Sequence, residues 1–131
     1  MRVFRGVRTG LQRTLAAERF ADIALFERRR AHERSLKLLV RCLTPAQRSE
    51  FAASSAFEVR GESGQRYRIT YGDTANIEVL AQSGMVVRQL CAGPVDIPIP
   101  AVMLAQKLML ETQESEFLRI ARVVRGIALP A

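Results

Sequence analysis

The side chains best suited to metal binding or nucleophilic catalysis are few in this sequence. It contains one histidine, His32, and two cysteines, Cys42 and Cys91. A zinc site needs several such ligands at fixed spacing, and a catalytic cysteine needs a neighbouring base. His32 stands among charged residues, which favours a solvated surface histidine. We therefore expect no metal, no cofactor and two buried, inert thiols.

Glycines and carboxylates offer no stronger candidate for chemistry. Gly61 and Gly64 stand between predicted strands, where turn geometry explains them without a phosphate-binding loop. Glu111, Glu114 and Glu116 fall in a polar helical stretch, which predicts a solvated face. No general base can be named, and the sequence favours a protein that is not an enzyme.

Positive charge is the feature most suited to binding a partner. Residues 1–50 contain 12 lysines and arginines against 5 acidic residues, whereas residues 51–131 contain 8 of each. The whole net charge of +7 therefore belongs to the N-terminal part. A basic cluster on a helix can meet several phosphates; a solvated charged helix is the alternative. The predicted polyanion-binding residues are Arg28, Arg29, Arg30, Arg34, Lys37 and Arg41.

A second group of arginines alternates along the predicted strands. If Tyr67, Ile69 and Tyr71 face the core, these arginines lie on the opposite face of the sheet. Glu58 and Glu78 alternate on that same face, so a cross-strand lattice of ion pairs is the alternative to binding. The secondary candidates are Arg60, Arg66, Arg68 and Arg88.

Hydrophobic periodicity predicts a long helix in the first part of the chain. Apolar residues recur near helical spacing and place this helix over residues 10–41. Residues 27–34 contain no large apolar side chain, so this stretch is either solvated or bound to a partner. The stretch that follows, residues 35–43, returns to apolar content and should dock on the core.

A capping box predicts where the next helix begins. Thr44 stands at the N-cap, Pro45 at the first helical position, and Gln47 is placed to bond back to the cap. A short second helix over roughly residues 45–53 follows.

The hydrophobic period changes to two after residue 57. Alternating runs predict four strands, and the short separators between them are rich in turn formers. Short separators favour hairpins, so the strands should form a four-stranded antiparallel meander. The strands are expected near residues 57–59, 67–71, 77–79 and 85–89.

The last third of the chain predicts one more helix. Pro94, Pro98 and Pro100 interrupt the sheet. Residues 101–125 then predict a long helix, bent in its polar residues 112–116, that packs on one face of the sheet. The expected fold class is α+β in a single domain, which divides into a basic helical arm, residues 1–34, and a compact core, residues 35–131.

The chain is expected to be cytoplasmic. No apolar run approaches the roughly 20 residues needed to span a bilayer, and no apolar signal segment is present, so we expect no membrane insertion. Residues 1–17 contain four arginines and no acid, which also suits a targeting segment. The acids that follow, from Glu18, continue the helical pattern and favour a structural helix.

A resemblance to a known family covers about residues 36–122. The motifs are Leu43-Thr-Pro-x-Gln47, Phe57-x-Val59-x-Gly61, Gly64-x-x-Tyr67-Arg68-Ile69, Gly72-x-x-x-Asn76-Ile77 and Met103-Leu-Ala-Gln-Lys107-x-x-Leu110-Glu111. With these motifs the chain resembles a family of short uncharacterised bacterial proteins, and the resemblance implies a compact unit preceded by a more variable attachment, with no activity to transfer.

A weaker resemblance rests on Asn76, Glu78, Cys91 and Gly93. Their positions resemble those of the ligands in the SWIM zinc module, in which a strand pair carries Cys-x-Cys and Cys-x-His opens the next helix. Because one ligand type alone remains, the resemblance does not imply zinc binding.

These features together predict a non-catalytic binding module. It would present its basic helix to a polyanionic partner, with nucleic acid or a ribonucleoprotein as the leading expectation. Aromatic residues make up 6% of the chain, which disfavours readout of single strands by stacking. The alternative is a protein-interaction subunit, inhibitor or adaptor that acts through the N-terminal helix, with self-association as one form of it.

Overall fold

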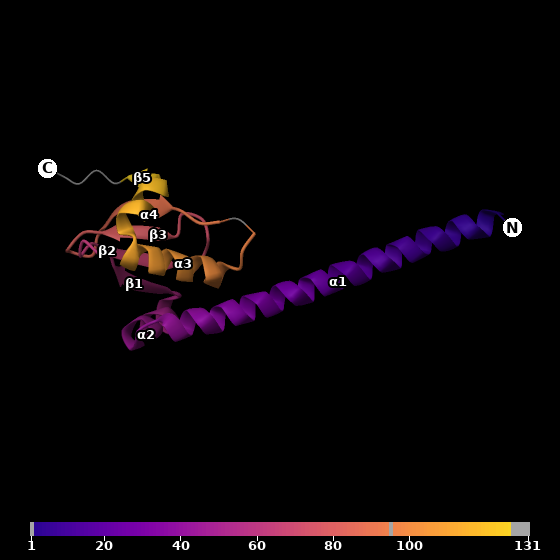
Figure 1. Cartoon of the computed structure of the whole chain (residues 1–131), viewed down its shortest axis with the longest axis horizontal. Coiled ribbons are helices and arrows are strands. Elements are labelled where there is room, and N and C mark those ends of the chain that lie inside the picture. Colours follow the sequence, from indigo (N-terminus) through magenta and orange to yellow (C-terminus); the bar gives the residue numbers. More distant parts are fainter. Residues whose placement is uncertain (1, 95, 127–131) are drawn as a thin grey trace.

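A long helix leads into a small unit of strands and shorter helices (Figure 1). The computed structural model describes the backbone of residues 2–94 and 96–126, and the side chains of residues 13–94 and 96–124. Helix α1 (Arg2–Cys42) has 41 residues and projects away from the rest of the molecule (Figure 1). At 1.5 Å per residue its length is about 60 Å.

Helix α1 is longer than the sequence pattern predicts. It begins at Arg2, so Gly6 and Gly10 lie inside the helix without ending it. The segment contains no proline and is rich in alanine, leucine, arginine and glutamate, which are strong helix formers. The predicted docking of its last turns is confirmed, because Leu39 and Leu43 are buried in the core.

Helix α2 (Pro45–Ser54) begins with the predicted capping box, which is confirmed. The Gln47 N–H donates to the Thr44 hydroxyl at 3.2 Å, and the Thr44 N–H donates to the Gln47 side chain at 3.0 Å. The helix also covers the outer edge of the first strand. There Gln47 donates to the Glu58 carbonyl at 2.8 Å, and the Glu58 N–H donates to Glu50 at 3.0 Å. These bonds occupy backbone groups that an exposed edge strand would leave free.

The sheet is an antiparallel meander, and the four predicted strands are confirmed. Each strand pairs with its neighbour in the chain, in the order β1-β2-β3-β4-β5. Gly64 and Gly84, both at a φ of 88°, make turns between strands in a conformation that favours glycine. The strands are β1 (Ala56–Arg60), β2 (Arg66–Thr70), β3 (Ile77–Leu80), β4 (Val86–Cys91) and β5 (Arg122–Gly126).

The predictions of one long C-terminal helix and of a four-stranded sheet are wrong. The segment forms two helices, α3 (Ile99–Thr112) and α4 (Glu114–Ile120), separated by Gln113, whose ψ of 48° breaks the helix. Residues 122–126 then form β5, which pairs with β4. The spacing of apolar residues here also fits a helix, but the β-branched pair Val123 and Val124 suits a strand, and the free edge of β4 supplies the partner.

Helices α3 and α4 cover one face of the sheet (Figure 1). A buried amide pair helps to hold α3 there: Asn76 and Gln106 donate to each other at 2.8 and 3.0 Å, and Gln106 also donates to the Ala92 carbonyl at 2.7 Å. The largest fully buried side chains of the core include Phe57, Tyr67, Ile69, Ile77, Met103, Leu110 and Phe117.

Candidate binding surface on helix α1

Helix α1 leaves the core near His32. The His32 Nε2 and the Tyr71 hydroxyl are hydrogen-bonded at 2.7 Å, and the two rings meet edge to face. His32 is therefore half-buried, and not solvated as predicted, while Tyr71 lies outside β2 and is exposed instead of facing the core. Every side chain from Arg13 to Arg30 is exposed, apart from the half-buried Ala24.

Four cations of α1 lie on one face of the helix. Arg30, Arg34, Lys37 and Arg41, which we call the basic row, follow one another at intervals of four, three and four residues, so they align along α1. By helical periodicity this face is roughly opposite the one that carries Leu39 and Leu43. All four are exposed, and no ion pair neutralises them within the described part of the chain.

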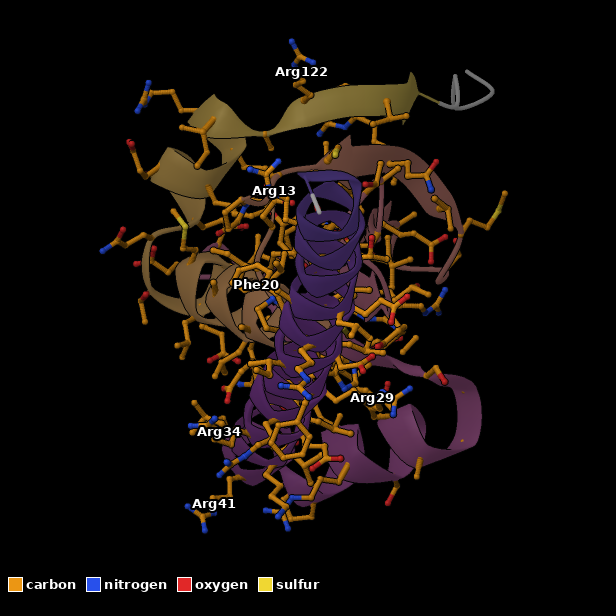
Figure 2. The ribbon with its side chains drawn as sticks, turned by 90° about the vertical axis from the view of Figure 1, so that its right-hand side faces the viewer. Arg13, Phe20, Arg29, Arg34, Arg41 and Arg122 are labelled. Atoms are coloured by element: carbon orange, nitrogen blue, oxygen red, sulfur yellow. The ribbon has the colours of Figure 1, made fainter. Side chains whose placement is uncertain are left out.

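The predicted cluster of six cations is thus divided. Arg28 and Arg29 precede the basic row in sequence, but helical periodicity turns both away from its face. In Figure 2, with α1 pointing towards the viewer, Arg34 and Arg41 lie on one side of the helix and Arg29 on the other. A partner that contacts the basic row would therefore leave Arg28 and Arg29 aside.

Exposed apolar side chains also lie on α1, on the N-terminal side of the basic row. Leu15, Phe20, Ile23 and Phe26 are between 52% and 75% exposed. Leu15, Phe20 and Ile23 line an open hollow of about 470 Å³ together with Ala16 and Arg19. The guanidinium of Arg30 lies over the Phe26 ring at 5.7 Å, which joins the apolar residues to the basic row. The projecting helix therefore offers both an apolar and a cationic surface.

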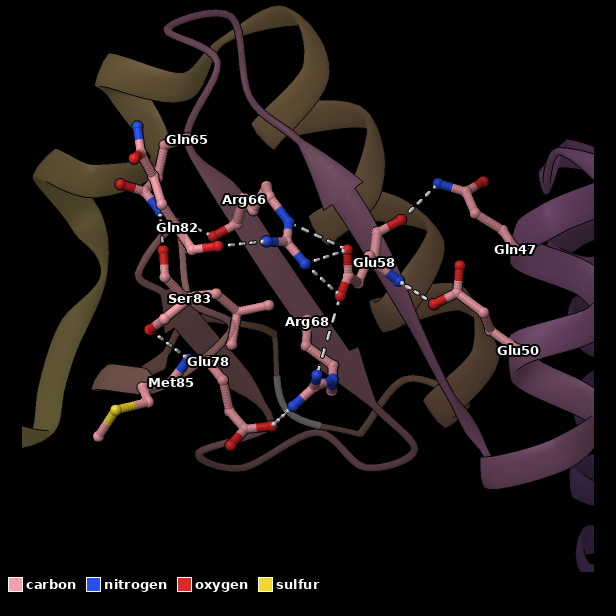
Figure 3. Close-up of polar contacts among 11 residues, drawn as sticks. Gln47, Glu50, Glu58, Gln65, Arg66, Arg68, Glu78, Gln82, Ser83 and Met85 are labelled. Carbon is pink, nitrogen blue, oxygen red and sulfur yellow. Dashed lines mark hydrogen bonds and ion pairs between the residues drawn. The ribbon is translucent and has the colours of Figure 1, made fainter.

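Two of the four predicted arginines of the sheet are paired instead of free. Arg66 forms an ion pair with Glu58 at 2.8 Å, and Arg68 lies between Glu58 at 3.8 Å and Glu78 at 3.6 Å (Figure 3). The lattice alternative therefore holds for Arg66 and Arg68. Arg60 is exposed at the end of β1 and has no ion-pair partner among the residues that the structure describes.

Arg88 lies on the other face of the sheet, so its predicted placement is wrong. It pairs in register with Val79, which is buried beneath the helices, because the bulge between Val79 and Leu80 shifts the alternation of β4. There Arg88 lines a pocket of about 290 Å³ whose wall includes Tyr67 and Glu114.

Glu114 is the polar residue that sequence reasoning placed wrongly. It is 5% exposed, not solvated, and accepts hydrogen bonds from the Tyr67 hydroxyl at 2.6 Å, the Ser63 N–H at 2.7 Å and the Ser63 hydroxyl at 2.9 Å. A Cβ at Gly61 would lie 2.3 Å from its carboxylate, so this close approach explains Gly61 better than turn geometry does. The signal in the sequence that could have indicated a buried acceptor was Tyr67, since the hydroxyl of a buried tyrosine needs a hydrogen-bond acceptor.

The hydrogen bonds of Glu114 set its charge state. Burial by itself would raise the pKa of Glu114, but the bonds from Tyr67 and Ser63 outweigh it, and the pKa lies below its ordinary value. Burial, followed by the bond to Glu114, raises the pKa of the Tyr67 phenol. A carboxylate with both oxygens bonded and a lowered pKa suits a structural anchor between α4 and the β1–β2 turn better than a general base.

The remaining candidates for chemistry lie apart. Cys42 is exposed, contrary to the prediction of a buried thiol, because Leu39 and Leu43 occupy the docked side of the last turns of α1; Cys91 is partly exposed. Of the positions that resemble the SWIM module, Asn76 is bonded to Gln106 and Glu78 is paired with Arg68. Nowhere in residues 2–94 and 96–126 do three or more histidine, cysteine or acidic side chains gather as metal ligands would.

Comparisons with known proteins identify no relative. No protein-family model matches the chain, and neither the curated proteins nor the solved structures compared with it include a match. Within the described residues, no helix has both the length and the apolar content that crossing a membrane requires. Both family resemblances therefore stay predictions, and function has to be argued from the geometry.

Proposed function

We propose that the protein is a non-catalytic binding module that contacts a polyanion, nucleic acid by itself or within a ribonucleoprotein, through the basic row of α1. Cys42 and Cys91 are free thiols, which suits a reducing compartment, and we place the protein in the cytoplasm.

The observation that supports this proposal is the contrast between two sets of cations. Arg66 and Arg68 are offset by carboxylates on neighbouring strands. The basic row has no such partner in the part of the chain that the structure describes, and it stands on a helix face turned away from the core. Unpaired cations give up little when they meet phosphates, since no internal ion pair has to be broken.

The dimensions of the basic row fit a phosphate backbone. It extends over about 16 Å of helix at 1.5 Å per residue, a length over which duplex nucleic acid presents several phosphates. Binding would be driven largely by release of the counterions condensed on the nucleic acid. Such contacts give affinity without reading base sequence.

Binding to duplex nucleic acid over a series of salt concentrations tests the proposal. The test variant is Arg34→Gln with Lys37→Gln, which removes two charges from the basic row. We expect it to weaken binding and to reduce the slope of log affinity against log salt by about 2, at roughly 0.9 for each phosphate that is no longer neutralised.

The matched control is Arg28→Gln with Arg29→Gln, which removes the same charge from other faces of α1. We expect this control to keep most of the affinity and of the salt slope. An equal loss in both variants would show that the basic row has no special part. Affinity that does not vary with salt would contradict the proposal itself.

A further inference from the structure

A second row of side chains on α1 has a pattern of charged and apolar residues that would pair with the same row of a second copy running in the opposite direction. Leu15, Arg19, Asp22 and Phe26, which we call the central row, are spaced by four, three and four residues and so share one helix face. Leu15 and Phe26 are 52% and 57% exposed, and Arg19 and Asp22 are also exposed. Neither charge has an ion-pair partner among the described side chains.

The order of the central row is apolar, basic, acidic, apolar. The spacing of the row is the same in both directions along the helix, but the order of its two charges is reversed when the row is read from the other end. A second copy running antiparallel would place Leu15 level with the partner's Phe26 and Arg19 level with the partner's Asp22. The same contacts would occur twice, once in each direction, as a two-fold axis requires.

We propose that two copies of the chain associate through their α1 helices in an antiparallel pair, with the central row at the interface. The two-fold axis passes at the level of Phe20 and Ala21. Ile23, which borders the central row and is 61% exposed, is partly covered by the same pairing, whereas Phe20 lies about a third of a turn from the row and stays outside it. The association gives Leu15, Ile23 and Phe26 a partner, which the molecule's own core does not provide.

A parallel pair of helices would oppose like charges. Arg19 would meet the partner's Arg19 and Asp22 the partner's Asp22, and the two basic rows would run side by side. Like charges held together at an interface disfavour a complex strongly. The antiparallel arrangement instead separates the two basic rows by roughly 45 Å, at 1.5 Å per residue along the paired helices.

The molecule's own core leaves the central row accessible. Helical periodicity places this row about a third of a turn around α1 from the docked face, which carries His32, Leu39 and Leu43. The row also precedes the first contact with the core in sequence, because α1 meets the core near His32. The projecting position of α1 in Figure 1 leaves room for a second helix along it.

Charge reversal at the two polar positions of the central row tests the pairing. Sedimentation equilibrium on the full chain, free of nucleic acid and at physiological salt, measures its mass from about 1 µM to about 1 mM, a range that includes most specific associations. We expect the mass to rise from the 14.6 kDa of one copy towards twice that value. Arg19→Glu alone and Asp22→Arg alone should each weaken association by about tenfold or more, because each creates two like-charge contacts.

The combined variant, Arg19→Glu with Asp22→Arg, should return association to within about threefold of the unmodified chain, because it restores both ion pairs with their signs exchanged. Arg28→Glu is the control, since it makes the same charge change as Arg19→Glu but away from the central row. A monomer throughout the concentration range would overturn the proposal. So would a combined variant that associates no better than the single ones, which would indicate another register or a different protein as partner.

Discussion

The projecting part of α1 and the sheet use the same kinds of residue in opposite ways. In the sheet, Arg66 and Arg68 face carboxylates across the strands, and Glu114 accepts three hydrogen bonds beneath the helices. On α1, the basic row has no ion pair within the described residues. Charge is therefore not handled uniformly in this chain: Arg66, Arg68 and Glu114 are compensated internally, and the basic row of α1 is left for a partner.

Apolar side chains show the same division. Phe57 on β1 is fully buried and stacks on Phe51 with ring centres 5.9 Å apart, whereas Phe20 on α1 is 75% exposed. Burial of an aromatic ring stabilises a fold, but an exposed ring contributes little until a partner covers it. Stability should therefore depend on the core and be almost indifferent to the projecting residues.

The largest expected effect comes from truncating these two rings. Phe57→Ala should lower the free energy of unfolding by about 3–5 kcal/mol, because it removes a buried ring and leaves a cavity. Phe20→Ala should change it by less than about 0.5 kcal/mol. Urea unfolding at low protein concentration measures both without interference from association. Similar losses in the two variants would mean that α1 folds back onto the core in solution.

A smaller effect is expected from the buried anchor of the core. Glu114→Gln keeps the shape of the side chain but removes the charge that Tyr67 and Ser63 bond to, and it should cost about 1–3 kcal/mol at neutral pH. The pKa of Glu114 lies below its ordinary value of 4.5 in the folded protein. Its contribution is therefore fully present above about pH 4.5 and is lost as the pH falls through the lowered pKa.

Unfolding measured as a function of pH checks this assignment. The difference in stability between the unmodified chain and Glu114→Gln should shrink below about pH 4.5, because the carboxyl then takes up a proton in the unfolded state before it does so in the folded state. Glu116→Gln is the control, because the pKa of Glu116 is also lowered, by its bond to Arg119, but that pair is exposed. A difference that stays constant from neutral to acid pH would exclude the charge of Glu114 as its source.

The smallest expected effect is at the point where α1 meets the core. Tyr71→Phe removes the 2.7 Å hydrogen bond to His32 but keeps the ring. Since the site is partly exposed, the loss should be about 0.5–1 kcal/mol and local. Amide hydrogen exchange should become faster in the turn of α1 around His32 and stay unchanged in β2 and β3. Unchanged exchange in that turn would show that other contacts hold α1 in place.

Local patterns predicted much of this fold. The capping box of Thr44 and Gln47, the first four strands and the docking of residues 35–43 all follow from residues near one another in sequence. The fifth strand does not, because residues 122–126 suit a helix by spacing and become a strand on meeting the edge of β4. The burial of Glu114 was not predicted for the same reason, since its partners Ser63 and Tyr67 lie far from it in the chain.

The candidate binding surface itself stays a prediction. Sequence composition located the positive charge in the first 50 residues but grouped all six cations together, although the helical spacing of α1 separates the basic row from Arg28 and Arg29. Sequence composition could not predict whether a given arginine has an ion-pair partner. Arg66 and Arg68 are neutralised only because strand register brings Glu58 and Glu78 beside them.

The sequence by itself determined where the charge lies, where α2 begins, and which residues share a face of α1, because these depend on neighbours within a few residues. The tertiary structure decided which charges are compensated, which face of the sheet Arg88 occupies, and that the part of α1 before His32 stands clear of the core. Those outcomes depend on contacts between residues distant in the chain, and their free energies arise only once the strands and helices have packed together.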